Sequence, residues 1–161
     1  MAATYEPIAT TTLGSATLTV TFSSIPSTYT DLVIAATGLT TLGTTLTMRF
    51  NGDTATNYSD THLYGHASGV NGSGRNTSSN QMFLFNWYND SQGTGLINIQ
   101  NYANTTTNKT VIMRGGQAGY NVWATVGLWR NTSAINSVAL IADATAFEIG
   151  ATFTLYGIAA A

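Results

Sequence analysis

The sequence lacks several features on which common classes of protein depend. It contains no cysteine, which excludes disulfide bonds and thiolate metal sites. Only 7% of its 161 residues are charged, whereas an average soluble domain has about 25%. The five basic residues form no stripe that could neutralise phosphates, and no apolar run is long enough to span a bilayer. We therefore expect neither nucleic acid nor a membrane as a partner.

The first residues, Met1 to Pro7, contain neither a positively charged region nor an apolar core. A secretory signal peptide needs both. We therefore expect the chain to be synthesised in the cytoplasm without a signal peptide.

Uncharged polar residues take the place of the missing charges. The chain has 29 Thr, 12 Ser and 14 Asn, which together make up about a third of it. Hydrophobic residues make up 43% and aromatic residues 11%, so the chain can build a core and disorder is not expected. The length fits one domain that covers residues 1–161.

Apolar residues alternate with polar ones along much of the chain, as in strands with one buried face. This alternation occurs in residues 16–22, 45–50, 122–129 and 152–156, and less regular apolar runs occur at 32–36, 82–87, 96–99, 111–113 and 135–141. Clusters of Gly, Asn, Ser and Thr separate these runs. The sequence predicts an all-β protein: a single antiparallel β-sandwich, jelly-roll-like, with about nine to eleven short strands.

Two segments depart from the pattern of one apolar and one polar face. In residues 122–129 both faces carry large apolar side chains, because Val122 and Val126 alternate with Trp123 and Trp129. Residues 67–80 form the longest polar stretch and show no apolar alternation, which predicts a long polar loop.

The sequence shows no recognisable catalytic motif. It has no Gly-x-Ser-x-Gly elbow, phosphate-binding loop or dinucleotide fingerprint, and most of its carboxylates stand at turn positions. We therefore expect that the protein is not an enzyme and has no catalytic residue and no cofactor.

The two histidines raise the question of a metal site. On a strand, Asp60, His62 and His66 would share one face, but the two imidazoles would lie about 13 Å apart. Only a break at Gly65 would bring them together. We therefore expect no metal ion and assign both histidines to a hydrogen-bonded surface or interface.

The aromatic residues allow two interpretations. One is a platform on which sugars stack, and the other is that large rings fill the core of the sandwich or a subunit interface, which we favour. The residues in question are Trp87, Tyr88, Tyr102, Tyr120, Trp123 and Trp129.

Three stretches of the sequence carry a family resemblance. They are Phe22–Leu32, Arg49–Ser59 continuing to Gly65, and Ala134–Val138 continuing through Gly150–Ile158. In this order they resemble a group of small structural proteins in the virions of tailed bacteriophages, notably marine and cyanobacterial phages. The resemblance implies a virion protein and leaves its place on the particle open.

The low net charge of −2 favours association, and hydroxyl-rich sheets suit contact with neighbouring copies. We expect a capsid decoration (cement) protein on the head surface, a homotrimer that binds the major capsid protein and copies of itself. The alternative is a tail-fibre or receptor-binding module that recognises host surface polysaccharide.

Expected exposure, rather than any motif, selects the candidate contact elements. They are residues 1–9, as an N-terminal anchoring segment, and the polar stretch 67–80. The candidate partner contacts are Tyr5, Glu6, Arg75, Trp87 and Tyr88.

Overall fold

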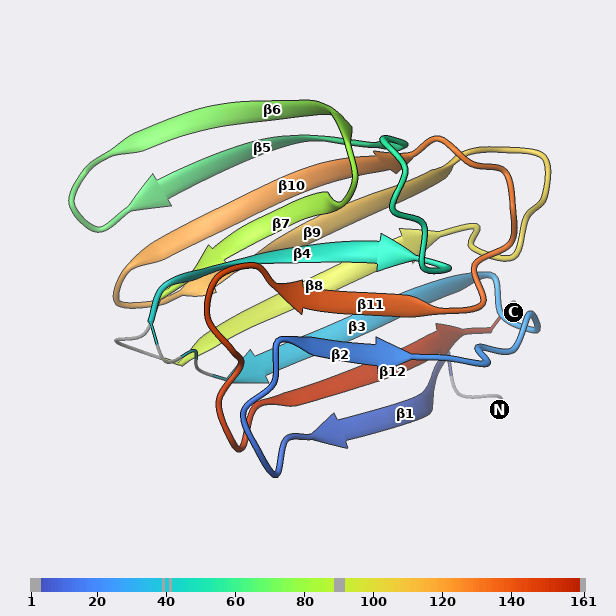
Figure 1. Cartoon of the computed structure of the whole chain (residues 1–161), viewed down its shortest axis with the longest axis horizontal. Helices are drawn as coiled ribbons and strands as arrows, with labels where there is room; N and C mark the ends of the chain where they lie inside the picture. Colours follow the sequence, from blue (N-terminus) through green and yellow to red (C-terminus); the bar gives the residue numbers. More distant parts are fainter. Residues whose placement is uncertain (1–3, 39, 41, 89–91, 160–161) are drawn as a thin grey trace.

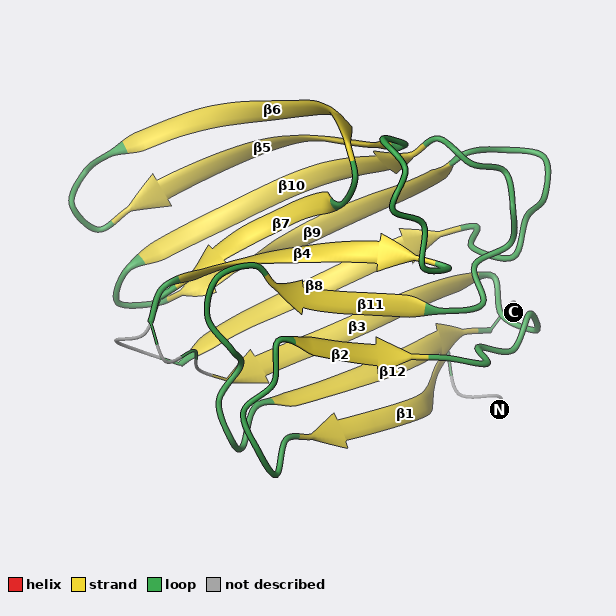
Figure 2. Cartoon of the chain, viewed as in Figure 1, coloured by secondary structure: helices red, strands yellow, loops and turns green. Residues whose placement is uncertain are grey.

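The computed structural model describes residues 4–38, 40, 42–88 and 92–159. In this part of the chain every regular element is a β-strand (Figure 2). None of these residues belongs to a helix that could cross a membrane. The twelve strands of the described residues are β1 (Tyr5–Thr12), β2 (Thr19–Phe22), β3 (Asp31–Gly38), β4 (Thr44–Phe50), β5 (Tyr58–His66), β6 (Asn71–Ser79), β7 (Met82–Trp87), β8 (Gly93–Gln100), β9 (Lys109–Gln117), β10 (Asn121–Trp129), β11 (Val138–Ala142) and β12 (Thr152–Ile158).

The strands form two antiparallel sheets that pack face to face (Figure 1). The larger sheet has the order β1-β12-β3-β8-β9-β10-β5-β6, and the smaller sheet has the order β2-β11-β4-β7. This is the strand order of a jelly roll, with the hairpin β9–β10 inserted between β8 and β5 and with β12 and β1 added beside β3. The predicted jelly-roll-like β-sandwich is confirmed.

The hydrophobic core lies between the two sheets. Alternate residues of the predicted strands face inward, so that Val20 and Phe22 on β2 meet Leu155 and its neighbours from the larger sheet in one buried cluster. The largest fully buried side chains include Trp87 and Trp129. Burial of each large apolar side chain contributes about 1.5–3 kcal/mol, so this cluster is the main source of stability.

Strand β10 buries its aromatic face and exposes its aliphatic face. Trp123 and Trp129 point into the core, whereas Val122 and Val126 are exposed. The larger sheet thus presents aliphatic side chains on its outer face, the side away from the smaller sheet. Periodicity alone does not choose between two apolar faces, but an indole fills the space between sheets better than a valine.

Each of the predicted apolar runs overlaps one strand, and the strands that were not in that list are β1, β5 and β6. Every residue of β1 and β6 is at least partly exposed. These strands lie at the two edges of the larger sheet, beyond most of the smaller one (Figure 1). The predicted strand number of nine to eleven is too low, because β1 and β6, with two solvated faces, show no apolar alternation, and β5 carries Asp60 and His62 rather than aliphatic residues on its inner face.

The prediction of a long loop at residues 67–80 is wrong. Only a tight turn precedes β6, which pairs with β5 along most of its length. Gly72 and Gly74 lie directly beneath the side chains of Tyr64 and His62, where a Cβ atom would overlap the rings. The strand therefore alternates glycine with polar residues, and a search for hydrophobic period cannot find it.

The expected N-terminal anchoring segment, residues 1–9, is in part a strand. Residues 1–3 lie outside the described residues, and β1 begins at Tyr5 and pairs with β12. The described part of this segment is therefore the edge of the larger sheet.

Candidate functional site

The surroundings of the two histidines were compared with those of a metal site. Among the residues that the structure describes, no three His, Asp or Glu side chains cluster in a way that could hold a metal ion. His62 Nδ1 lies 3.3 Å from Asp60 Oδ2. Asp60 is buried and also accepts hydrogen bonds from Asn76 Nδ2 and from the backbone N–H of Phe83. This carboxylate thus ties β5 to β6 and β7, which is a structural role.

A buried lysine is also accounted for by structure. Lys109 Nζ donates hydrogen bonds to the carbonyl oxygens of Thr107 at 2.7 Å and Thr132 at 3.0 Å. Burial of the side chain lowers the pKa of Lys109. Its ammonium group joins the segments on either side of the hairpin β9–β10. Two surfaces, rather than a buried charge, remain as candidate functional sites.

The first surface is an aliphatic patch on the outer side of the larger sheet, which we call the outer apolar face. It consists of Leu63 on β5, Ile112 on β9, and Val122 and Val126 on β10, whose side chains are 45–63% exposed. The register places Val126 directly beside Ile112, and Leu63 beside Ala124. Adjacent exposed apolar side chains of this kind make the face a candidate interaction site.

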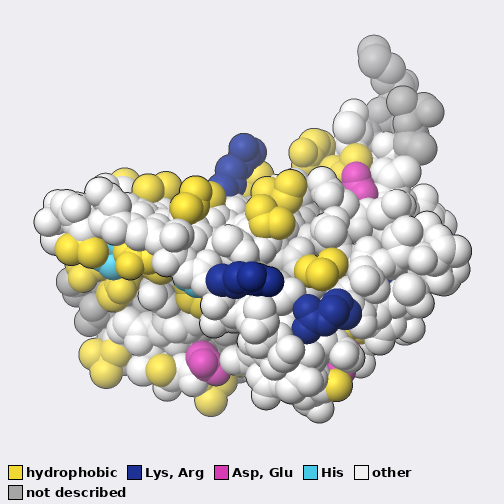
Figure 3. All heavy atoms as spheres, turned by 90° about the horizontal axis from the view of Figure 1, so that it is seen from above, with side chains coloured by type: hydrophobic (Ala, Val, Ile, Leu, Met, Phe, Trp, Pro, Cys, Tyr) yellow, Lys and Arg dark blue, Asp and Glu magenta, His cyan; other side chains and the backbone are white. Residues whose placement is uncertain are grey.

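Two shallow hollows border the outer apolar face. One, of about 320 Å³, is lined by Val126, Thr61 and Arg75 among others. The other, of about 280 Å³, includes Ile112 and Tyr5. The predicted contact residues Tyr5 and Arg75 are both exposed, and they lie at opposite borders of this face. In the view of Figure 3 hydrophobic groups stand among mostly uncharged polar atoms.

The second surface is a cluster of rings at one end of the sandwich, which we call the aromatic end. It consists of Tyr64, His66, Tyr88, Tyr120 and Trp123. The ring centroids of Tyr88 and Tyr120 are 4.3 Å apart, and those of Tyr64 and Trp123 are 4.7 Å apart. The His66 ring contacts all four of the others. The left of Figure 3 shows histidine atoms among hydrophobic ones.

Buried amides fix the aromatic end. Gln117 Nε2 donates a hydrogen bond to the carbonyl of Tyr88, and Gln117 Oε1 accepts one from the backbone N–H of Tyr88 at 2.7 Å. Asn121 Nδ2 donates to the carbonyl of Asn86. These bonds attach the end of β7 to the hairpin β9–β10 of the other sheet. Burial raises the pKa of the Tyr88 hydroxyl above its usual value.

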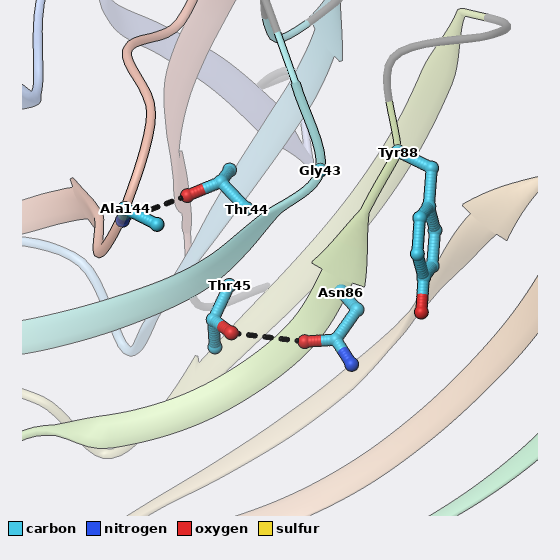
Figure 4. Close-up of a pocket in the computed structure, with 6 residues that line it drawn as sticks. All are labelled: Gly43, Thr44, Thr45, Asn86, Tyr88 and Ala144. Carbon is cyan, nitrogen blue, oxygen red and sulfur yellow. Dashed lines mark hydrogen bonds between the residues drawn. The ribbon is translucent and has the colours of Figure 1, made fainter.

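Two pockets flank the Tyr88–Tyr120 pair. The pocket of Figure 4, about 240 Å³, is lined by Gly43, Thr44, Thr45, Asn86, Tyr88 and Ala144. In it, Thr45 Oγ1 donates a hydrogen bond of 3.0 Å to Asn86 Oδ1. The second pocket, about 410 Å³, is lined by Gly65, His66, Ala67, Asn71, Ala118, Tyr120, Asn121 and Val122. The end of the sandwich thus combines partly exposed rings with amide and hydroxyl groups.

The predicted partner contacts fall into different places. Glu6 Oε2 accepts a hydrogen bond of 3.1 Å from the hydroxyl of Tyr29, and Tyr88 belongs to the aromatic end. Trp87 is wrong as a contact residue, because it is fully buried and its ring stacks on Phe85. A register shift between β4 and β7 accompanies the inward placement of Phe85 and Trp87, and the sequence gives no signal for it.

The interpretation that we favoured is confirmed for the four buried rings of Trp87, Tyr102, Trp123 and Trp129, which belong to the core cluster. Tyr88 and Tyr120 lie at the aromatic end with their rings partly exposed, and a sugar platform there stays a prediction. Sequence reasoning missed Tyr64 and His66 as their neighbours, although the alternation along 60–66 already put these residues on one face. The chain matches no family model, and neither curated proteins nor solved structures give a significant match. The resemblance to phage virion proteins therefore stays a prediction.

Proposed function

We propose that this chain is a virion structural protein, a capsid decoration protein whose outer apolar face binds the major capsid protein. The observation that carries the proposal is this face, on which Leu63, Val122 and Val126 are each more than half exposed. When a partner covers such an apolar side chain, removal of its surface from water contributes about 25 cal/mol for each Å² to the free energy of association. The family resemblance supports a phage particle as the place where that partner is found.

Low charge suits this role. With a formal net charge of −2, copies that lie close together on a shell repel one another little. A protein that binds only the assembled shell stabilises it by mass action. Because the contact repeats over many sites, a modest free energy at each site is enough.

We further propose that the protein acts as a homotrimer. The border residues Tyr5 and Arg75 lie on opposite sides of the outer apolar face, where they are available to neighbouring copies. Analytical ultracentrifugation of the purified chain gives the oligomeric state directly. A strictly monomeric protein at high concentration would contradict the trimer and leave the shell contact to be tested separately.

Immunogold labelling of phage particles that carry this chain, with an antibody against it, tests the location. We expect gold over the head, and densitometry of purified particles should give hundreds of copies, on the order expected for a repeated shell component. Label confined to the tail tip, with a few copies per particle, would overturn the decoration role. It would favour a tail-fibre module that binds host polysaccharide.

A further inference from the structure

We infer that the aromatic end binds a neutral saccharide, with one sugar residue resting on the ring of Tyr120 and hydroxyl groups held in the two flanking pockets. This inference does not depend on whether the protein sits on the head or the tail. It concerns the end of the sandwich, which adjoins the outer apolar face at Val122.

The ring pair supplies the stacking surface. Tyr120 is 37% exposed, and its ring lies against that of Tyr88, whose backbone N–H and carbonyl are both hydrogen-bonded to the Gln117 side chain. A pyranose offers a face of C–H groups that packs on the electron-rich face of an aromatic ring. Because Tyr88 supports Tyr120 from behind, little side-chain entropy is lost when a sugar binds.

The polar groups of the pockets suit hydroxyl groups. Thr45 and Asn86 line one pocket, and the exposed Asn71 lines the other. Amides and hydroxyls can both donate and accept hydrogen bonds, as sugar hydroxyls also do. The two pockets lie on either side of one ring pair, so an oligosaccharide chain could occupy both.

The charge of the site selects the class of saccharide. Among the described residues that line the two pockets there is no Asp, Glu, Lys or Arg. An acidic sugar would lose hydration in these pockets without gaining a cationic partner, which is unfavourable. The site therefore favours neutral hexose units over uronic acids or sulfated sugars.

Two buried ring nitrogen atoms of the aromatic end support the same site. Trp123 Nε1 and His66 Nε2 are buried, and neither has a hydrogen-bond partner among the residues that the structure describes. Such groups are rare in native proteins because they lose hydration without compensation. His66 lines the same pocket as Tyr120, so a turn of the Tyr120 ring would open the His66 nitrogen to a sugar hydroxyl.

Isothermal titration calorimetry on the full chain tests the inference. The probes are short neutral gluco-, manno- and galacto-oligosaccharides, together with the same sugars as uronic acids or sulfate esters. We expect a neutral member to bind, Tyr120→Ala to weaken it about tenfold, and Tyr120→Phe to retain it. Tyr5→Ala is the matched control, because Tyr5 is an exposed tyrosine far from the aromatic end on the opposite edge strand β1.

A second measurement keeps the test independent of how the variants fold. In a ¹⁵N–¹H spectrum of the wild-type chain, the bound sugar should shift the indole signal of Trp123 and leave that of Trp129, which lies at the other end of β10, unchanged. The inference is overturned if no neutral sugar binds at millimolar concentration, if the acidic sugars bind more tightly, or if Tyr120→Ala and Tyr5→Ala behave alike.

Discussion

The indole Nε1 of Trp129 donates a hydrogen bond of 2.7 Å to Oδ2 of Asp53 and so joins the two sheets. Trp129 ends β10 of the larger sheet, and Asp53 lies in the turn after β4 of the smaller one. The same carboxylate accepts hydrogen bonds from Asn57 Nδ2 and from the backbone N–H of Ala55. Burial acts to raise the pKa of Asp53, but these hydrogen bonds outweigh it and hold the pKa below its usual value.

We predict that Asp53 contributes to acid sensitivity. Because its folded-state pKa is lowered, the ionised carboxylate stabilises the protein above the unfolded-state pKa, and this stability is lost as the pH falls through the folded-state pKa. Asp53→Asn should cost about 1–3 kcal/mol at neutral pH and should flatten the acid side of the stability profile. Urea unfolding over a pH series measures both effects, with Glu148→Gln as the control. Parallel profiles for wild type and Asp53→Asn would contradict the prediction.

A second prediction concerns the alkaline side. The hydroxyl of Tyr58 accepts a hydrogen bond from the backbone N–H of Phe50 and donates one to the carbonyl of Asp53. Burial raises the pKa of Tyr58 from 10.0 to about 12. The stability that depends on the neutral hydroxyl is therefore complete below pH 10.0 and is lost as the pH rises toward about 12.

Tyr58→Phe tests this directly. It should lower the free energy of unfolding by about 1–3 kcal/mol at neutral pH and remove part of the alkaline loss. Denaturant unfolding at increasing pH gives the comparison, and Tyr5→Phe on exposed strand β1 is the matched control. An unchanged alkaline profile in Tyr58→Phe would show that this hydroxyl does not carry the effect.

The third prediction concerns a glycine on the inner face of the larger sheet. A Cβ atom at Gly93 would overlap the indole of Trp87, a rigid ring with no space to move in the core. We expect Gly93→Ala to destabilise the fold by about 1–3 kcal/mol, in the range of other overpacked core positions. Gly119→Ala is the control, because among the described residues no heavy atom beyond Gly119 and its two chain neighbours lies within 4 Å of the Cβ position there. Chemical unfolding measures the free energy of unfolding of both variants, and equal values would contradict the prediction.

The fourth prediction tests the outer apolar face. Val126→Lys and Ile112→Lys place a charge on exposed positions, so the free energy of unfolding should change by only about 0.5 kcal/mol. Binding to capsid shells that lack the protein should nevertheless be abolished. Thr21→Lys, on the exposed side of the smaller sheet, should bind as the wild type does. Co-sedimentation with shells measures occupancy, and normal occupancy of both lysine variants would remove this face from the proposed contact.

The sequence predicted the parts of the fold that have one apolar face. Strands such as β2 and β12 alternate apolar residues with threonine, and their buried faces are those that the alternation predicts. Where both faces are apolar, as in β10, or both are solvated, as in β6, local pattern carries no such information. Of the contact residues predicted from the sequence, Tyr5 and Arg75 are exposed and Tyr88 is partly exposed, whereas the fully buried Trp87 was placed wrongly.

The sequence by itself determined the fold class, the low charge and the absence of cysteine, because these depend on composition and on a period of two residues. Only the tertiary structure decided which face of β10 meets water, that residues 71–79 pair as a strand, and that Tyr64, His66, Tyr88 and Tyr120 come together. These outcomes depend on contacts between strands far apart in the chain. The reason is geometric: how two sheets fit together is set by the shapes of both, and neither sheet is contiguous in sequence.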